Sequence, residues 1–234
     1  HKDQERYNWQ FNIVSLYIPW GDEARCLIAG PLIDSIYDNG SYPMITWEPW
    51  GALFRDATLR SDQQLLSRIT TGAYDRYLEK FAAGIKALNR PVFLRFAHEA
   101  DNPFYPWSSS GGNTPGSFKN AWGYTHDFFV QRGVYNAVWV WNPWKAENAA
   151  AYFPGVRYVD WLGVTMLNYG KLNDDGRDYS FKELYAPFHQ LPLFRSDIPV
   201  MIAETGSLRG EGNQDIWLNN ALSIIEKEMK EIKP

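Results

Sequence analysis

Two glutamates, each at the end of a hydrophobic run, are the residues in this chain best placed to do chemistry. Glu99 ends the segment PVFLRFAHE at 91–99, and Glu204 lies in the segment PVMIAETG at 199–206. Hydrophobic runs that stop at a carboxylate are typical of parallel strands buried on both faces, and in α/β barrels the active site lies at the carboxyl ends of such strands. A single glutamate there more often forms a salt bridge. Two of them, each in an aromatic and polar cluster, favour the paired carboxylates of glycoside hydrolysis.

Strand alternation predicts how these side chains point. It places Arg95, Ala97 and Glu99 on one face of the first run, and it places Glu204 on the same face as Val200 and Ile202 in the second. If both faces line a barrel interior, the two carboxyl groups point into one cup. We expect them to lie about 5–5.5 Å apart, the separation at which one carboxylate attacks the sugar directly.

Other hydrolytic chemistries lack their residues. The pair His98-Glu99 is not followed by the second histidine of a helical zinc motif, because Asn102 fills that position. The chain has four histidines, which are scattered, one cysteine (Cys26) and no G-x-S-x-G segment. No metal or organic cofactor is predicted.

Six buried strands are predicted to position the site, with helical patterns between them. The strands are expected at Phe11–Tyr17, Pro43–Trp47, Val92–His98, Ala137–Trp141, Trp161–Leu167 and Val200–Ala203. Helices are expected around 74–88, 118–132 and 216–225, with cap patterns at Ser61, Thr114 and Ser180. The alternation of strand and helix predicts an α/β fold, a (β/α)₈ TIM barrel. A doubly wound sheet is the rival, but the turn after the first strand lacks the glycine-rich fingerprint.

Composition is consistent with a single domain over residues 1–234. The net charge is −4 with no basic run, which argues against nucleic acid as a partner, and no apolar stretch is long enough for a membrane span. Aromatic residues make up 16% of the chain, including 11 Trp. Many follow predicted strands, where flat rings suit the faces of sugars, although packing in the core explains any one of them equally well.

Several segments together resemble glycoside hydrolase family 26, whose members include β-mannanases and enzymes acting on mixed-linkage β-glucan or β-1,3-xylan. They include GAYDRYL at 72–78, RFAHEADNPFYPW at 95–107, VWVWNP at 138–143 and AETG at 203–206. The resemblance covers nearly the whole chain in order. It implies a retaining endo-β-glycosidase, most simply a β-mannanase, acting on a polysaccharide or oligosaccharide. Alternatives are an endoglucanase, lichenase or xylanase on the same scaffold, or a carbohydrate-binding protein without turnover.

The resemblance also implies roles for individual residues. Glu99 takes the acid/base position and Glu204 the nucleophile position. The residues implied to bind substrate are His98, Arg95, Trp47, Glu48, Trp50, Trp107, Trp141, Asn142 and Tyr169, with Trp107 as an aromatic platform and Tyr169 contacting the nucleophile. One departure concerns 100–102, where this chain has Ala-Asp-Asn and the family commonly has Met-Asn-Gly.

The resemblance sets the strand count. If Glu99 ends barrel strand four and Glu204 strand seven, strands one and eight lie outside residues 1–234, and an opening is expected between Phe11–Tyr17 and Val200–Ala203. We further expect an extracellular or cell-surface location, and a monomer or a part of a larger multidomain protein.

Overall fold

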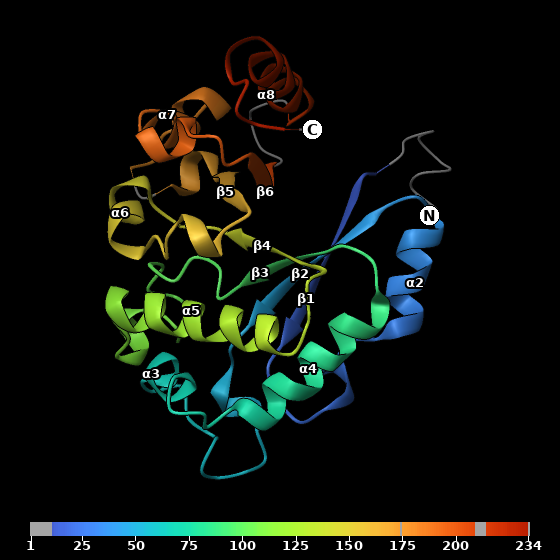
Figure 1. The fold of residues 1–234 in the computed structure, drawn as a ribbon. Helices are drawn as coiled ribbons and strands as arrows, with labels where there is room; N and C mark the ends of the chain where they lie inside the picture. Colours follow the sequence, from blue (N-terminus) through green and yellow to red (C-terminus); the bar gives the residue numbers. More distant parts are fainter. Residues whose placement is uncertain (1–10, 174, 209–213, 234) are drawn as a thin grey trace.

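A six-stranded parallel sheet, curled into a half-barrel, forms the centre of the molecule (Figure 1). The computed structural model describes residues 11–173, 175–208 and 214–233. The strands are β1 (Ile13–Pro19), β2 (Tyr42–Glu48), β3 (Val92–Phe96), β4 (Ala137–Trp141), β5 (Trp161–Asn168) and β6 (Val200–Ser207). They are hydrogen-bonded in sequence order, each parallel to the next. The six predicted parallel strands are confirmed, and a closed ring of eight is not seen among the described residues.

Helices cover the convex face of this sheet. They are α2 (Gly30–Asp38), α3 (Leu65–Ile69), α4 (Asp75–Leu88), α5 (Pro115–Gln131), α6 (Ala149–Tyr152), α7 (Phe181–His189) and α8 (Gln214–Glu228). Seven short 3-10 turns, η1 to η7, lie in the connections at Ala24–Cys26, Gly51–Leu53, Ser109–Gly111, Ala146–Asn148, Val156–Tyr158, Gly170–Leu172 and Pro192–Arg195. The N-cap predicted at Thr114 and the capping box predicted at Ser180 are confirmed, and Thr114 also forms a capping box, with Ser117. The one predicted at Ser61 is wrong, because α3 begins only after Gln64.

The two faces of the sheet carry separate hydrophobic layers. Side chains such as Leu94, Trp139 and Val164 point outward and pack against the helices in one large core. A smaller cluster lies on the inner face and consists of Met44, Val140 and Met201, with Ile13, Phe93, Trp161 and Ala203 packed around it. The inner layer forms the floor beneath the strand ends that carry the predicted site.

Strand β6 contains a β-bulge immediately before Glu204. Val164 of β5 pairs with Ile202, but the next residue, Thr165, pairs with Glu204, so Ala203 is the extra residue. The expectation that Val200, Ile202 and Glu204 share a face is therefore wrong. Val200 and Ile202 pack in the outer core, and the bulge turns Glu204 to the inner face.

Strand β3 is shorter than predicted. It ends at Phe96, and the turn that follows contains two residues with left-handed backbone, Ala97 (φ 42°) and Glu99 (φ 50°). Alternation therefore places Arg95 on the inner face as expected but does not place Glu99. The turn, not the strand, aims that carboxyl.

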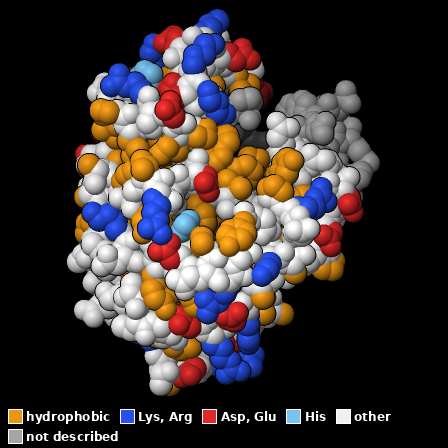
Figure 2. Space-filling model, viewed as in Figure 1, with side chains coloured by type: hydrophobic (Ala, Val, Ile, Leu, Met, Phe, Trp, Pro, Cys, Tyr) orange, Lys and Arg blue, Asp and Glu red, His pale blue; other side chains and the backbone are white. Residues whose placement is uncertain are grey.

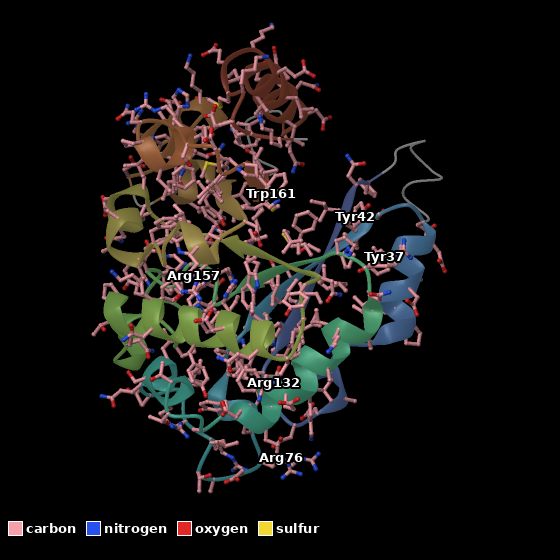
Figure 3. All side chains as sticks on the ribbon, in the orientation of Figure 1. Tyr37, Tyr42, Arg76, Arg132, Arg157 and Trp161 are labelled. Carbon is pink, nitrogen blue, oxygen red and sulfur yellow. The ribbon has the colours of Figure 1, made fainter. Side chains whose placement is uncertain are left out.

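The two outermost strands of the sheet are β1 and β6, as the expected opening requires. After α8, Ile232 forms a parallel bridge with Val200, and the Lys233 amide donates to the Val200 carbonyl at 2.9 Å. The predicted final helix is thus confirmed, and the chain after it lies beside β6. On the face in Figure 2, hydrophobic side chains gather across the middle of the molecule. Figure 3 labels Tyr42 and Trp161, which begin β2 and β5, in the two halves of the curled sheet.

Gly111 offers a test of how the loops over α3 are packed. A Cβ added there meets the Pro106 carbonyl oxygen at 1.8 Å and the Asp62 carbonyl at 2.9 Å. Backbone cannot move aside cheaply, so we expect Gly111→Ala to lower the unfolding free energy by more than about 2 kcal/mol, a fall in Tm of at least ~4 °C. In the matched control Gly116→Ala the new Cβ meets only the Thr114 hydroxyl, at 3.6 Å, within α5. Its Tm should stay level or rise. Similar Tm values for the two variants, measured by calorimetry, would contradict this packing.

Candidate active site

The buried guanidinium of Arg95 is the centre of the polar cluster at the carboxyl ends of the strands. Its Nε donates to the Thr46 hydroxyl at 2.9 Å, and its Nη1 donates to Asn142 Oδ1 at 2.9 Å. Its Nη2 donates to Glu204 Oε1 at 2.7 Å and to the Tyr17 hydroxyl at 3.1 Å. The side chain is completely buried. Strands β1, β2 and β6 and the end of β4 therefore meet on one residue of β3.

Glu204 is held by two donors on a single oxygen. Oε1 accepts from Arg95 and from the Tyr17 hydroxyl, the latter at 2.9 Å. Of the described residues, none donates a hydrogen bond to Oε2. The side chain is 28% exposed. Glu204 thus presents one oxygen to the concave side while the other is fixed in place.

Glu99 lies in a drier environment. Its residue is 5% exposed, its amide donates to the Asn142 carbonyl at 2.7 Å, and its Oε2 accepts from Asn102 Nδ2 at 2.8 Å. Burial is the largest influence on the carboxyl and raises its pKa. Hydrogen bonds from Thr165 and Asn102 work against that rise, and the charge of Glu204 adds to it.

His98 is enclosed by aromatic rings. It is 1% exposed, its Nε2 is 3.1 Å from the Tyr105 hydroxyl, and its ring lies 5.7 Å from that of Trp107. Burial, and then the charge of Arg95, hold its pKa well below the usual value, so the imidazole is neutral at neutral pH. Its Nδ1 is buried without a partner among the described residues.

A third carboxyl, that of Glu48, lies at the end of β2. Burial raises its pKa, the Trp50 indole N–H (3.3 Å from Oε2) and Arg95 lower it, and the charge of Glu204 raises it slightly. The pKa of Tyr169 is raised by burial and by the charges of Glu99 and Glu204. Glu48, Trp50 and Tyr169 therefore belong to the neighbourhood of the two glutamates. No group of three or more His, Cys, Asp or Glu residues in the described ranges could hold a metal ion.

Three of the aromatic residues predicted to bind substrate are buried among other side chains, which corrects those predictions: Trp47, Trp141 and Trp107. Trp47 is 0% exposed, stacks on Phe81 at 4.1 Å between ring centres, and lies in the outer core. Trp141, 1% exposed, packs on Phe153 in the same core. Both point to the helix side because strand alternation puts them opposite the inner face.

Trp107 is also 0% exposed and does not form an open platform. It stacks beneath Tyr105 at 4.5 Å and 11°, and its indole N–H donates to the His98 carbonyl at 2.7 Å. Trp107 supports the turn that carries Glu99. The accessible rings of that loop are Tyr105 and Phe104, the latter 85% exposed.

Sequence reasoning missed the residue that contacts Glu204 through a hydroxyl. The resemblance assigned that contact to Tyr169, but Tyr17 makes it, from strand β1. Thr46, Thr165 and Asn102 were also missed as site residues. Of these three residues, only Thr46 could have been found from strand register, because it lies opposite Arg95 on the neighbouring strand.

A parallel, curled sheet with polar and acidic side chains gathered at the carboxyl ends of its strands is typical of α/β-barrel enzymes. A sequence model of glycosyl hydrolase family 26 matches residues 38–195. The chain belongs to this family.

Relatives and solved structures agree with that assignment. Endoglucanase H of Acetivibrio thermocellus is 30% identical over 98% of this chain and 25% of its own length. A beta-1,3-xylanase of Alcaligenes sp. is 24% identical over 55% of this chain and 27% of its own. This chain thus spans about a quarter of the curated relatives that it matches. The catalytic domain of an endo-beta-1,4-mannanase from Bacillus sp. JAMB-750 superposes with a TM-score of 0.71 over 92% of this chain and 65% of its own, at 16% identity.

Burial of Glu99 leads to a prediction about stability and pH. Its folded pKa is raised above the ordinary 4.5, so between the two values the folded state binds more protons than the unfolded state. Stability therefore falls as pH rises through that window, and the loss persists above it. Glu99→Gln removes the loss. We expect its Tm to exceed that of the parent at about pH 8 and the difference to shrink toward about pH 4.

The control is Glu226→Gln, which changes an exposed glutamate on α8. Its Tm should follow the parent at both pH values. A Glu99→Gln variant whose Tm difference from the parent is the same at both pH values would show that Glu99 does not carry a raised pKa.

Proposed function

We propose that this chain is the catalytic part of a retaining endo-β-glycosidase in which Glu204 is the nucleophile and Glu99 the acid/base. The observation that carries the proposal is the contrast between the two carboxyl groups. Arg95 forms an ion pair with Glu204 and Tyr17 donates to the same oxygen, whereas burial raises the pKa of Glu99. A nucleophile must be ionised and a general acid must hold its proton, so the two environments match the two roles.

In the first step, Oε2 of Glu204 attacks the anomeric carbon and the glycosidic C–O bond breaks. Arg95 and Tyr17 keep Oε1 in place and so fix the direction of attack. Glu99 transfers its proton to the leaving oxygen. The products are a glycosyl ester on Glu204 and an ionised Glu99.

In the second step, Glu99 acts as the base. It removes a proton from a water molecule, whose oxygen attacks the anomeric carbon and displaces Glu204. Glu99 is then protonated again, Glu204 is released as a carboxylate, and the sugar keeps its original anomeric configuration. A separation of about 5–5.5 Å between the carboxyl groups remains our prediction for this pair.

The proposed substrate is a β-linked polysaccharide. Family membership favours a β-mannan, and the similarity to a protein named Endoglucanase H over 98% of this chain favours a β-glucan as the second candidate. Glu48, Trp50 and Tyr169 lie near the two glutamates and remain proposed sugar-contacting residues. Arg95, Asn142 and His98 are at most 2% exposed, and we propose that they serve binding by holding the residues around them in place.

We further propose an extracellular or cell-surface location, because a polysaccharide of this kind is met outside the cell. The chain is proposed to act as a monomer or as one part of a larger protein; its match to a quarter of Endoglucanase H supports the second. No helix within the described ranges has the length and apolar character that crossing a membrane demands.

Substitution of the two glutamates separates their roles. Glu204→Ala should abolish turnover while leaving oligosaccharide binding largely intact, because the proposed sugar-contacting residues remain. Glu99→Ala should slow polysaccharide hydrolysis by about 10²–10⁴-fold, the usual contribution of general acid catalysis. It should slow an aryl glycoside with an activated leaving group far less, since that group departs without a proton. Equal losses on both substrates, with the exposed Glu226→Ala variant fully active, would remove Glu99 from the acid role.

The stereochemistry of the product tests the double displacement itself. Purified protein is incubated with galactomannan, mixed-linkage β-glucan and β-1,3-xylan, and the anomeric protons are followed by NMR from the first minutes. We expect one polymer to be cut internally and the β-anomer to appear first. Initial formation of the α-anomer would mean inversion and would exclude Glu204 as a nucleophile.

A further inference from the structure

The turn that carries Glu99 is strained and needs support from elsewhere. Ala97 and Glu99 both have left-handed backbone, which costs a residue with a Cβ on the order of 1 kcal/mol or more. Such conformations persist only where surrounding contacts over-determine them. Two backbone hydrogen bonds help, from the Ala97 amide to the Trp47 carbonyl at 3.0 Å and from the Glu99 amide to the Asn142 carbonyl at 2.7 Å.

The third support is a side chain, that of Asp101. Its Oδ1 accepts from the Trp144 amide at 2.7 Å, and its Oδ2 accepts from the Lys145 amide at 2.9 Å and from Asn148 Nδ2 at 3.1 Å. All three donors belong to the connection between β4 and α6. One half-buried carboxylate thus joins the β3 turn to the next loop through three hydrogen bonds.

Asp101 is also linked to the carboxyl of Glu99 through the residue that follows it in the chain. The following residue, Asn102, donates from Nδ2 to Glu99 Oε2 at 2.8 Å, and its amide donates to the Glu99 carbonyl at 2.8 Å. Fixing Asp101 therefore fixes both the backbone of Glu99 and the amide that orients its carboxyl.

We propose that Asp101 is the positioning residue of the acid/base: through the β4–α6 connection it holds Glu99 where the leaving oxygen departs, without touching the sugar. This inference rests on the proposed function. Asparagine cannot replace it, because all three partners are donors and an amide would turn its own N–H groups toward at least one of them.

The test compares Asp101→Asn with Asp160→Asn. Asp160 likewise accepts a backbone hydrogen bond, from the Trp139 amide at 2.8 Å, but that donor lies in the middle of β4 and not in the connection after it. For each variant, kcat/KM is measured on the polysaccharide that the parent cleaves and on a dinitrophenyl glycoside of the same sugar. Asp101→Asn should lose about 10–100-fold on the polysaccharide, as expected when a catalytic group is misplaced. Its loss on the activated substrate should be less than about threefold, since that reaction needs no acid.

Two further measurements separate positioning from stability. Without a fixed Asn102, the Glu99 carboxyl loses a hydrogen bond that lowers its pKa, so the alkaline limb of the pH profile should move up in Asp101→Asn. Amide hydrogen exchange at Glu99 and Asn102 should quicken in the same variant and not in Asp160→Asn, and this is observable without substrate. Equal losses on both substrates with an unmoved pH limb would overturn the role of Asp101. If Glu99→Ala shows no leaving-group dependence either, the proposed function itself fails. Unchanged amide exchange in Asp101→Asn would overturn the proposal whatever the activity.

Discussion

The structure of the candidate site depends on burying the charge of Arg95. Moving a guanidinium out of water costs several kcal/mol, and that cost is offset only where donors find acceptors and an opposite charge lies close by. Arg95 meets both conditions. It donates to Thr46, Asn142 and Tyr17, and it pairs with Glu204 at 2.7 Å. These partners come from separate strands, so the hydrogen bonds of one side chain fix the relative positions of strand ends that the backbone ladder alone would leave adjustable.

Arg95 also lies differently with respect to the two glutamates. It contacts Glu204 directly, but it is only the last of the influences on Glu99, where burial comes first and hydrogen bonds and the Glu204 charge follow. A cation midway between the two carboxyl groups would favour the ionised form of both, and neither could then act as the general acid. Burial, and then the charge of Arg95, lower the pKa of His98, which therefore stays neutral beside the acid and does not compete as a proton donor at neutral pH.

The regular part of this architecture could be predicted from the sequence, and the irregular part could not. Hydrophobic runs located all six strands, and the capping patterns at Thr114 and Ser180 located two helix starts. Trp47 and Trp141 were misassigned because a tryptophan near a strand end looks the same whether it points to the groove or to the helices, and only strand alternation decides. Tyr17 was missed because its contact with Glu204 spans 187 positions and depends on how far the sheet curls.

Glu99 and Glu204 reach the inner face by local departures from regular strand geometry. Strict alternation from Val200 would have turned Glu204 toward the helices; one extra residue, Ala203, reverses it. Glu99 likewise follows a strand that has already ended and depends on a left-handed turn. The bulge lies within β6 and the turn follows β3, and in both places the ladder before the departure keeps its register, so the hydrophobic layer of Met44, Val140 and Met201 stays intact. Stability is supplied by the regular floor. The direction of the reactive carboxyl groups is set by the residues around them, and a substitution at Asp101 or Asn102 can change the orientation of the Glu99 carboxyl without disturbing the sheet.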